Sequence, residues 1–375
     1  MKHPSSYLKW YTRVPELEYD FRSSGLSFFK YNLNLGNVDL SANYAHGNPE
    51  TVRLLADYYH VQPENVFVSS EGASGQNARV IKVLAEVLKG KNEAVVEFPT
   101  YEPLLRQAQE HFRTVRRFER TKEEGYRLNP DAIRRTITTR TGLVVLTNPH
   151  APSGSVADRR ELGEVMQLAH DHDFFVVCDE IYAEFNRAVV PSLFSIDPER
   201  AIVTASFTKA FGLGGLKLGT ALASKTMVDQ LYSDVLHTIG NSSNIVQAVA
   251  ARILANDRDR LEAHTEIWSG LKRRMESWLD ETNLQYTPNR VGVTYWVKTP
   301  IEDTYNWTNE TTIKKYRLAA VPGAFFLFKG DNRIVKSSML RLGLGAINPE
   351  AQFEDALETL EKTLKNQRAD ARIQH

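Results

Sequence analysis

Short apolar runs alternate with longer amphipathic segments through much of the chain. Four runs are rich in valine and isoleucine and have the length of single strands: Glu93–Phe98, Gly142–Leu146, Phe174–Cys178 and Ala201–Thr204. Runs of this kind predict strands that are buried on both faces. Between two of them, residues 160–172 carry an apolar stripe at helical spacing, made by Leu162, Val165, Met166 and Ala169. Strands alternating with helices predict an α/β fold, with a mostly parallel sheet flanked by helices.

The pattern changes after about residue 257. A long charged helix is predicted over Asp257–Thr282, because its apolar residues recur at helical spacing. Strand-like and helical stretches then alternate: Val291–Val297, Thr311–Arg317, Met339–Leu342 and a final helix from Pro349 to about Asn366. This mixture predicts a second, smaller α+β domain.

The first 40 or so residues contain no clear strand–helix unit, and we expect them to pack with the smaller domain. The large domain is therefore predicted to span residues 45–275, and the small domain to combine residues 1–44 and 276–375. The start of the chain is rich in aromatic residues, namely Tyr7, Trp10, Tyr11, Tyr19, Phe21, Phe28 and Phe29. These side chains could line an apolar substrate pocket or fill the core of the small domain.

Composition excludes several classes of protein. Among 375 residues, 46 Lys and Arg balance 46 Asp and Glu, so a basic surface for nucleic acid or an anionic membrane is not expected. A hydrophobic share of 42% argues against a mainly disordered chain. The single cysteine, Cys178, cannot form an intrachain disulfide. With no long apolar run and no signal-peptide pattern, we expect a cytoplasmic protein without a membrane span.

The segment SFTKAFGLGGLKLG, residues 206–219, is the first candidate for chemistry. Lys209 lies in an otherwise uncharged loop after a buried strand, where open α/β sheets place their ligands. Partial burial lowers the pKa of a lysine, as a Schiff-base lysine requires. Ser206 and Lys217 would add a hydroxyl and a second cation for a phosphate. A flexible glycine loop with two surface lysines is the alternative.

Asp179 ends the very apolar run before it, in the sequence CDEIY. A carboxylate at the end of a buried strand is costly without a partner. It could face a cationic nitrogen of a bound cofactor, with Tyr182 beside it, or it could cap the next helix.

Two further loops are weaker signals. The small residues Ser70–Gly75 precede a predicted helix, whose N-terminus could bind an anion, although any capping serine looks similar. The loop Asn148–Gly154 would by itself be interpreted as a turn. His170 and His172 face apart at an offset of two on a helix, so no metal site is expected.

Taken together, these segments resemble the pyridoxal-phosphate-dependent aminotransferases of fold type I. The matching segments follow the order of that family over about residues 33–365: YAHG, SSEGASG, FPTYEP, NPHAPSG, CDEIY, SFTKAFGLGGLKLG and LRLGLG. The resemblance implies the cofactor pyridoxal 5'-phosphate, an amino acid and a 2-oxo acid as substrates, and a homodimer with shared active sites.

The resemblance also implies roles for individual residues. Lys209 would hold the cofactor as a Schiff base and move the α-proton of the substrate, so that amino groups are exchanged by ping-pong chemistry. Asp179 would pair with the pyridine nitrogen, Tyr182 would contact the phenolic oxygen, and Tyr101 would stack on the ring. The phosphate would be held by Ala73, Ser74, Ser206, Lys217 and, from the neighbouring subunit, Tyr44. The substrate would be bound by Arg341, at its α-carboxylate, and by Gly36.

Two positions depart from the family pattern. Ala151 stands where the family usually has an asparagine that donates to the phenolic oxygen, so the pKa of the Schiff base should rise unless Asn148 or His150 substitutes. Lys217 stands where the family usually has arginine. The same residues would also serve a lyase, decarboxylase or cyclising enzyme, which remains the alternative to an aminotransferase. Arg341 implies an α-carboxylate, whereas an acidic side chain would need another cation, such as Arg13 or Arg22.

Overall fold

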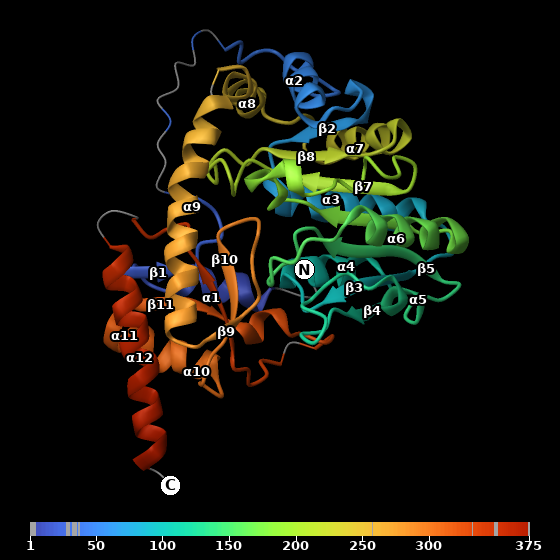
Figure 1. Cartoon of the computed structure of the whole chain (residues 1–375). Helices are drawn as coiled ribbons and strands as arrows, with labels where there is room; N and C mark the ends of the chain where they lie inside the picture. The colour runs from blue at the N-terminus through green and yellow to red at the C-terminus, as the bar shows by residue number, and fades with distance from the viewer. Residues whose placement is uncertain are drawn as a thin grey trace.

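The computed structural model describes residues 5–27, 31, 36, 38–256, 258–331, 333–348 and 352–373. Within them the chain forms two β-sheets with helices packed around both, and Figure 1 shows the larger sheet on the right and the smaller one at lower left. The long helix α9 (Arg258–Glu281) runs past both sheets. The predicted α/β fold is confirmed.

The larger sheet has seven strands in the order β2-β8-β7-β6-β5-β3-β4. β8 pairs antiparallel with both of its neighbours, and the remaining pairs are parallel. In chain order the strands are β2 (Val66–Ser69), β3 (Glu93–Phe98), β4 (Thr114–Glu119), β5 (Thr141–Thr147), β6 (Phe175–Asp179), β7 (Ala201–Ala205) and β8 (Gly219–Leu222).

The central strands are apolar throughout because both faces of this sheet are covered. Successive side chains of a strand point to opposite faces. In β5, Val145 packs in one hydrophobic cluster with α3 (Gly72–Val87), α4 (Glu102–His111) and α7 (Lys225–Thr238), whereas Val144 packs in another with α6 (Arg159–His172). The predicted strands at these positions are confirmed within one residue at each end.

The smaller sheet has the strand order β1-β11-β12-β10-β9 and draws on both ends of the chain. Its first strand, β1, pairs in parallel with β11, and the other pairs are antiparallel. The strands are β1 (Tyr19–Phe21), β9 (Gln285–Tyr286), β10 (Thr294–Lys298), β11 (Leu318–Pro322) and β12 (Met339–Gly343). The domain boundaries at residues 44 and 275 stay a proposal, which the place of β1 in this sheet supports.

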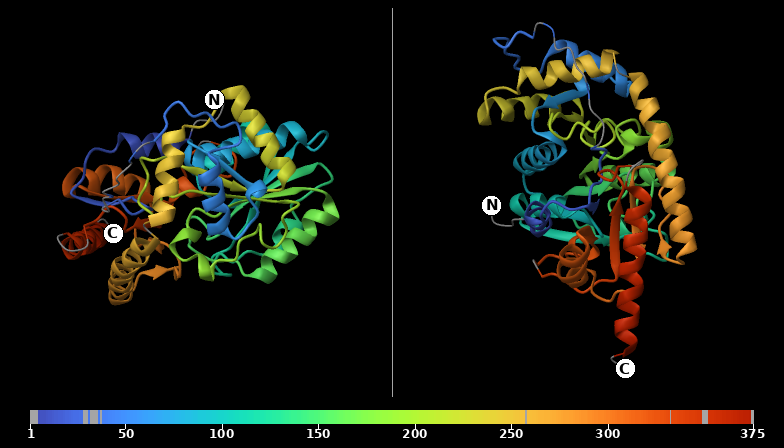
Figure 2. Two further views of the ribbon diagram at one scale, coloured as in Figure 1. Left: turned by 90° about the horizontal axis from the view of Figure 1, so that it is seen from above. Right: turned by 90° about the vertical axis from the view of Figure 1, so that its left-hand side faces the viewer.

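The remaining helices cover the sheets and the chain ends. Figure 2 shows α12 extending away from the body toward the C-terminus. These helices are α1 (Ser6–Arg13), α2 (Pro49–Tyr59), α5 (Pro130–Arg134), α8 (Asn244–Asn256), α10 (Thr304–Trp307), α11 (Ile313–Tyr316) and α12 (Phe353–Ile373). The helix predicted over Thr311–Arg317 is the end of a longer helical stretch, in which a π-helical segment, Thr308–Thr312, joins α10 to α11. The final helix extends past the predicted end near Asn366. Pro349 lies outside the described residues.

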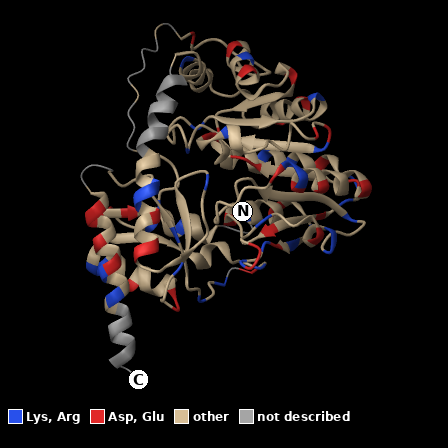
Figure 3. Cartoon of the chain, in the orientation of Figure 1, with Lys and Arg blue, Asp and Glu red and all other residues tan. Residues whose placement is uncertain are grey.

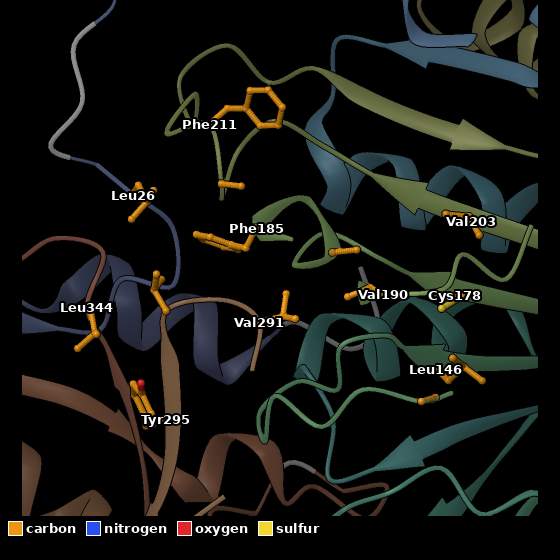
Figure 4. Packing of buried hydrophobic residues seen from close by; sticks show 14 of the residues in the cluster. Leu26, Leu146, Cys178, Phe185, Val190, Val203, Phe211, Val291, Tyr295 and Leu344 are labelled. Atoms are coloured by element: carbon orange, nitrogen blue, oxygen red, sulfur yellow. The ribbon is translucent and has the colours of Figure 1, made fainter. Parts of the chain in front are cut away.

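One hydrophobic cluster joins the two sheets. Leu146, Cys178 and Val203 lie opposite one another on neighbouring strands of the larger sheet, and the same cluster includes Tyr295 and Leu344 near the smaller one (Figure 4). This shared core fixes the two sheets relative to each other, which positions any site between them.

Many charged residues of both signs belong to the helices. Figure 3 shows basic and acidic residues interspersed there, in keeping with the balanced composition. Among the helices described, none is long and apolar enough to cross a membrane.

Candidate active site

The carboxyl ends of the parallel strands and the N-terminal segment enclose a cavity of about 340 Å³. The residues around it come from both sheets, from α1 and from the start of α3. They include Tyr7, Tyr11, Arg22, Ser24, Gly72, Ala73, Ser74, Tyr101, Thr147, Ala151, Asp179, Tyr182, Thr208, Lys209, Lys217 and Arg341. The edge of an open α/β sheet is where such folds bind their ligands.

Lys209 lies in the loop after β7 and is half-buried at this cavity. Its Nζ donates to the Ser24 hydroxyl at 3.0 Å. Burial lowers the pKa of Lys209, and the charges of Arg341 and Lys217 act in the same direction. The backbone of residue 25 passes so close that a Cβ there would lie 2.9 Å from the Lys209 Cα, which only glycine permits. The N-terminal segment therefore packs directly on the lysine.

Asp179 ends β6 and is 4% exposed. Its carboxylate accepts from the Asn77 amide at 2.7 Å and from the Ile181 backbone N–H at 3.0 Å. Burial raises its pKa, whereas these two donors and Lys209 lower it. The Thr204 hydroxyl donates to Asn77 at 2.5 Å and so fixes the amide orientation. Asp179 binds the next turn, as one interpretation expected, and it also lines the cavity. Its pairing with a cofactor nitrogen stays a prediction.

The start of helix α3, Glu71 and Lys217 form another part of the cavity lining. Helix α3 starts at Gly72 with no side-chain cap, because the preceding Glu71 pairs with Arg79 at 2.8 Å. Gly72, Ala73 and Ser74 at the start of this helix border the cavity together with Lys217, whose carbonyl oxygen accepts from the Gly72 N–H at 2.6 Å. An uncapped helix N-terminus and a nearby cation favour a bound phosphate.

Ser206 does not line the cavity. Its hydroxyl donates to the Leu218 carbonyl at 2.6 Å and lies 2.7 Å from the Thr208 hydroxyl. Thr208 does line the cavity. Any contact of Ser206 with a phosphate stays a prediction, and Thr208 is a site residue that the sequence did not single out.

Arg341, in β12 of the smaller sheet, is a buried cation that lines the cavity, with 2% of its surface exposed. Its Nη2 donates to the Tyr7 hydroxyl at 3.2 Å and to the Arg22 carbonyl at 2.7 Å, and its Nε has no hydrogen-bond partner among the described residues. A buried guanidinium with an unsatisfied N–H is suited to a carboxylate.

Aromatic rings surround Tyr7 at the cavity. The ring of Tyr101 lies edge-on to it with centroids 5.8 Å apart, and that of Tyr11 lies 5.9 Å away. Tyr182 lines the cavity as well. Trp10 and Phe21 are buried in hydrophobic clusters, as the core alternative expected, whereas Tyr7 and Tyr11 line the cavity. That these rings contact a substrate stays a prediction. Phe28 and Phe29 lie outside the described residues.

Asn148 and His150, the two residues that could substitute for an asparagine at position 151, are bound to other groups. The Asn148 amide donates to the Pro191 carbonyl at 3.2 Å and accepts from Ala157 N–H at 2.9 Å. The two ring nitrogens of His150 lie 2.7 Å from the Ser153 hydroxyl and 3.0 Å from the Pro99 carbonyl oxygen. Neither of these side chains lines the cavity, whereas Ala151 does.

Two predicted residues lie away from the cavity of their own chain. Tyr44 borders a separate hollow of about 300 Å³ beside α8. Gly36 lies next to Arg252, where a Cβ would come 3.1 Å from the guanidinium. Their predicted contacts with a phosphate and a substrate stay predictions.

The described residues contain no group of three or more His, Cys, Asp or Glu side chains that could hold a metal ion. His170 instead pairs with Asp197, with 2.5 Å between Nε2 and Oδ2.

Comparison with known proteins identifies the family. A family model described as "Aminotransferase class I and II" matches residues 37–360. The aromatic-amino-acid aminotransferase 2 of Thermococcus litoralis is 24% identical over 312 residues, which cover 78% of this chain and 75% of that protein. A histidinol-phosphate aminotransferase of Methanococcus maripaludis is 23% identical over 246 residues, covering 63% of this chain and 64% of that protein.

Solved structures with a similar fold include aminotransferases. The structure of an aspartate aminotransferase from Thermotoga maritima matches with a TM-score of 0.82 at 17% identity, over 97% of this chain and 98% of that one. Because the family model spans most of the sequence, this chain belongs to the class I and II aminotransferases, a family of pyridoxal-phosphate-dependent transaminases of fold type I.

Proposed function

We propose that this protein moves an amino group from an L-amino acid to a 2-oxo acid in two half-reactions at the cavity described above. The observation that carries the proposal is the meeting of Lys209, Asp179 and Arg341, which come from two sheets and line one cavity. A proton-transfer group, a buried carboxylate and a carboxylate receptor are the side chains that this chemistry requires.

The cavity fits pyridoxal phosphate in its charges. The uncapped start of α3, together with Thr208 and Lys217, would hold the phosphate, and Asp179 would pair with the pyridine nitrogen. Tyr101 and Tyr182 would contact the ring. When bound, the cofactor supplies an electron sink for the electron pair left at Cα.

Lys209 would bind the cofactor covalently and then carry a proton. An amine takes a proton only in its uncharged form, and burial lowers the pKa of Lys209 toward that form. Its Nζ would remove the proton from the substrate Cα. It would then deliver a proton to the cofactor from the same side. The Ser24 hydroxyl, 3.0 Å away, would orient Nζ between these positions.

Arg341 would bind the α-carboxylate of both substrates. Two parallel N–H groups of a guanidinium match the two oxygens of a carboxylate. The contacts of its Nη2 with Tyr7 and Arg22 fix the plane of the guanidinium beside the cavity.

A homodimer with shared sites forms part of the proposal. Tyr44 borders a hollow apart from Lys209 in its own chain, which is the placement expected of a residue that serves a neighbouring subunit. Mixing a Tyr44→Phe chain with a Lys209→Ala chain should restore activity, because the mixed dimer contains one site with both native residues.

The test is absorbance spectroscopy of the cofactor-loaded protein. Adding an amino acid should bleach the visible band and release a 2-oxo acid, and adding a second 2-oxo acid should restore the band. Bleaching that no 2-oxo acid reverses, with carbon dioxide or another fragment released, would contradict the proposal and favour a lyase or decarboxylase. Lys209→Ala is the control, because it removes covalent attachment and leaves Asp179 and Arg341 in place.

A further inference from the structure

Two arginines line the substrate side of the cavity, and their surroundings differ. Arg341 contacts only neutral groups, a tyrosine hydroxyl and a carbonyl oxygen, and no carboxylate of the described residues lies within 4.0 Å of it. Arg22 instead has an acidic partner, Asp20, two residues before it in the chain. One cation of the cavity is therefore open to a substrate carboxylate, whereas the other is already neutralised.

The pair of Arg22 and Asp20 is bidentate and largely buried. Nε and Nη2 of Arg22 donate to the two oxygens of Asp20 at 2.9 and 2.8 Å, and Nη1 donates to the Tyr11 carbonyl at 3.1 Å. Only 9% of the Arg22 side chain is exposed. A guanidinium whose N–H groups are already bound in this way has few donors left for a second carboxylate. Asp20 would also repel that carboxylate.

The wall beside this pair is apolar and aromatic. It is formed by Tyr7, Leu8 and Tyr11 of α1. The Tyr11 ring lies 4.8 Å from the Arg22 guanidinium carbon, so the ring covers the cation further. Leu8 is 41% exposed, an apolar side chain left uncovered where the cavity opens.

We propose that the substrate side chain is uncharged and apolar, aromatic rings included, and that Asp20 excludes acidic side chains by occupying Arg22. The proposal rests on the proposed function, because it places the α-carboxylate on Arg341. Asp20 acts through Arg22, so it is a positioning residue that determines specificity. An aspartate, a glutamate or a phosphate ester would bring a second anion to a wall without an open cation.

The test compares two unreactive carboxylates, 3-phenylpropionate and succinate, by their effect on the absorbance of the cofactor-loaded protein. The native protein should bind 3-phenylpropionate at least about tenfold more tightly than succinate. Asp20→Asn should free Arg22 and tighten succinate binding about tenfold, the effect of one charge-assisted pair, with little change for 3-phenylpropionate. Tighter succinate binding by the native protein would overturn the proposal.

A double variant shows whether the effect passes through Arg22. Asp20→Asn combined with Arg22→Gln should lose the gain in succinate affinity, which a general loosening of the segment would not do. Asp331→Asn is the matched control, because Asp331 pairs with Arg333 at 2.6 Å on the exposed surface. A gain of the same size in that control, or in the double variant, would overturn the role of Asp20.

Measurements of turnover distinguish a failure of this inference from a failure of the proposed function. Steady-state rates with phenylalanine, leucine, aspartate and glutamate should favour the first two. If amino groups are exchanged but acidic substrates are preferred, the inference is wrong and the proposed function stands. If 3-phenylpropionate binds more tightly but no amino acid is converted, the proposed function is wrong and the subsite stands.

Discussion

The two walls of the cavity are built in different ways. The wall at the edge of the larger sheet is made of short loops that follow buried strands, and its carboxylate Asp179 is fixed by two donors. The opposite wall includes the helix α1, whose first turn makes three hydrogen bonds to the Glu102 carboxylate, beside Arg22 and Arg341. The first wall includes the exposed polar side chains Ser74 and Lys217, whereas the exposed side chain of the second, Leu8, is apolar.

The difference matches what each wall would contact. A cofactor returns to the same state after every cycle, so fixed and buried charges suit it. The substrate wall would receive an amino acid and a 2-oxo acid in turn, and adaptable rings on a helix suit two ligands. Changes in the sheet-edge wall should therefore affect the chemical step, and changes that reach α1 should affect substrate binding.

The largest effect is expected at Lys209. Lys209→Ala removes both the covalent attachment and the proton carrier, so kcat/KM should fall about 10⁴-fold. Steady-state kinetics measure the loss, and mass spectrometry after borohydride reduction should find no cofactor bound to the chain. A variant that keeps more than a hundredth of native activity would contradict the role of this lysine.

Asp179→Asn tests the buried charge of the same wall. An amide of the same shape cannot hold a protonated pyridine nitrogen, so kcat should fall about 10³-fold. Asp173→Asn is a suitable control, because Asp173 is an exposed carboxylate paired with Arg200 at 2.9 Å. If Asp179→Asn raises only KM for the amino acid, the sheet-edge wall affects substrate binding rather than the chemical step, and the proposed division between the walls is wrong.

Much of the sheet-edge wall could be predicted from the sequence, because its residues lie in local motifs that follow apolar strands. Lys209, Asp179 and Lys217 belong to such motifs and line the cavity. Asn77 could not be found in this way, since it is a polar residue inside a helix, 102 positions from the carboxylate it binds. Ser24 is likewise 185 positions from Lys209.

Parts of the fold escaped prediction for related reasons. β4 is an edge strand with the sequence TVRRFE, whose charges are tolerated because one side of it is unpaired. β8 spans only four residues and starts with glycine, so the sequence has no apolar run from which this strand could be predicted. The helix α1 has no long periodic pattern, and its place depends on a contact with Glu102 that is nearly 100 residues away.

Glu102→Gln tests whether α1 affects substrate binding without affecting cofactor binding. The Glu102 carboxylate accepts from Ser5 Oγ, Ser6 N–H and Tyr7 N–H at 2.8, 3.1 and 2.6 Å, and an amide retains only one acceptor oxygen. Loosening α1 should raise KM for the amino acid about tenfold. Cofactor affinity, measured by fluorescence titration, should stay within a factor of two or so.

Glu164→Gln provides the comparison, because Glu164 lies on α6 with an exposed partner, Arg160, at 2.8 Å. Glu164→Gln should leave both KM for the amino acid and the affinity for the cofactor unchanged. An equal loss of cofactor affinity in Glu102→Gln would mean that α1 also supports the sheet-edge wall.

The smallest effect is expected from Ala151→Asn. Ala151 borders the cavity, and the side chains of Asn148 and His150 are bound elsewhere, so the phenolic oxygen of the cofactor would have Tyr182 as its side-chain donor from the described residues. An added amide would donate to that oxygen and lower the pKa of the loaded chromophore by about one unit, or about 1.4 kcal/mol. A pH titration of the absorbance measures the shift. Ala151→Leu fills similar space without a donor and should not lower the pKa; an equal decrease there would show that volume, rather than hydrogen bonding, sets it.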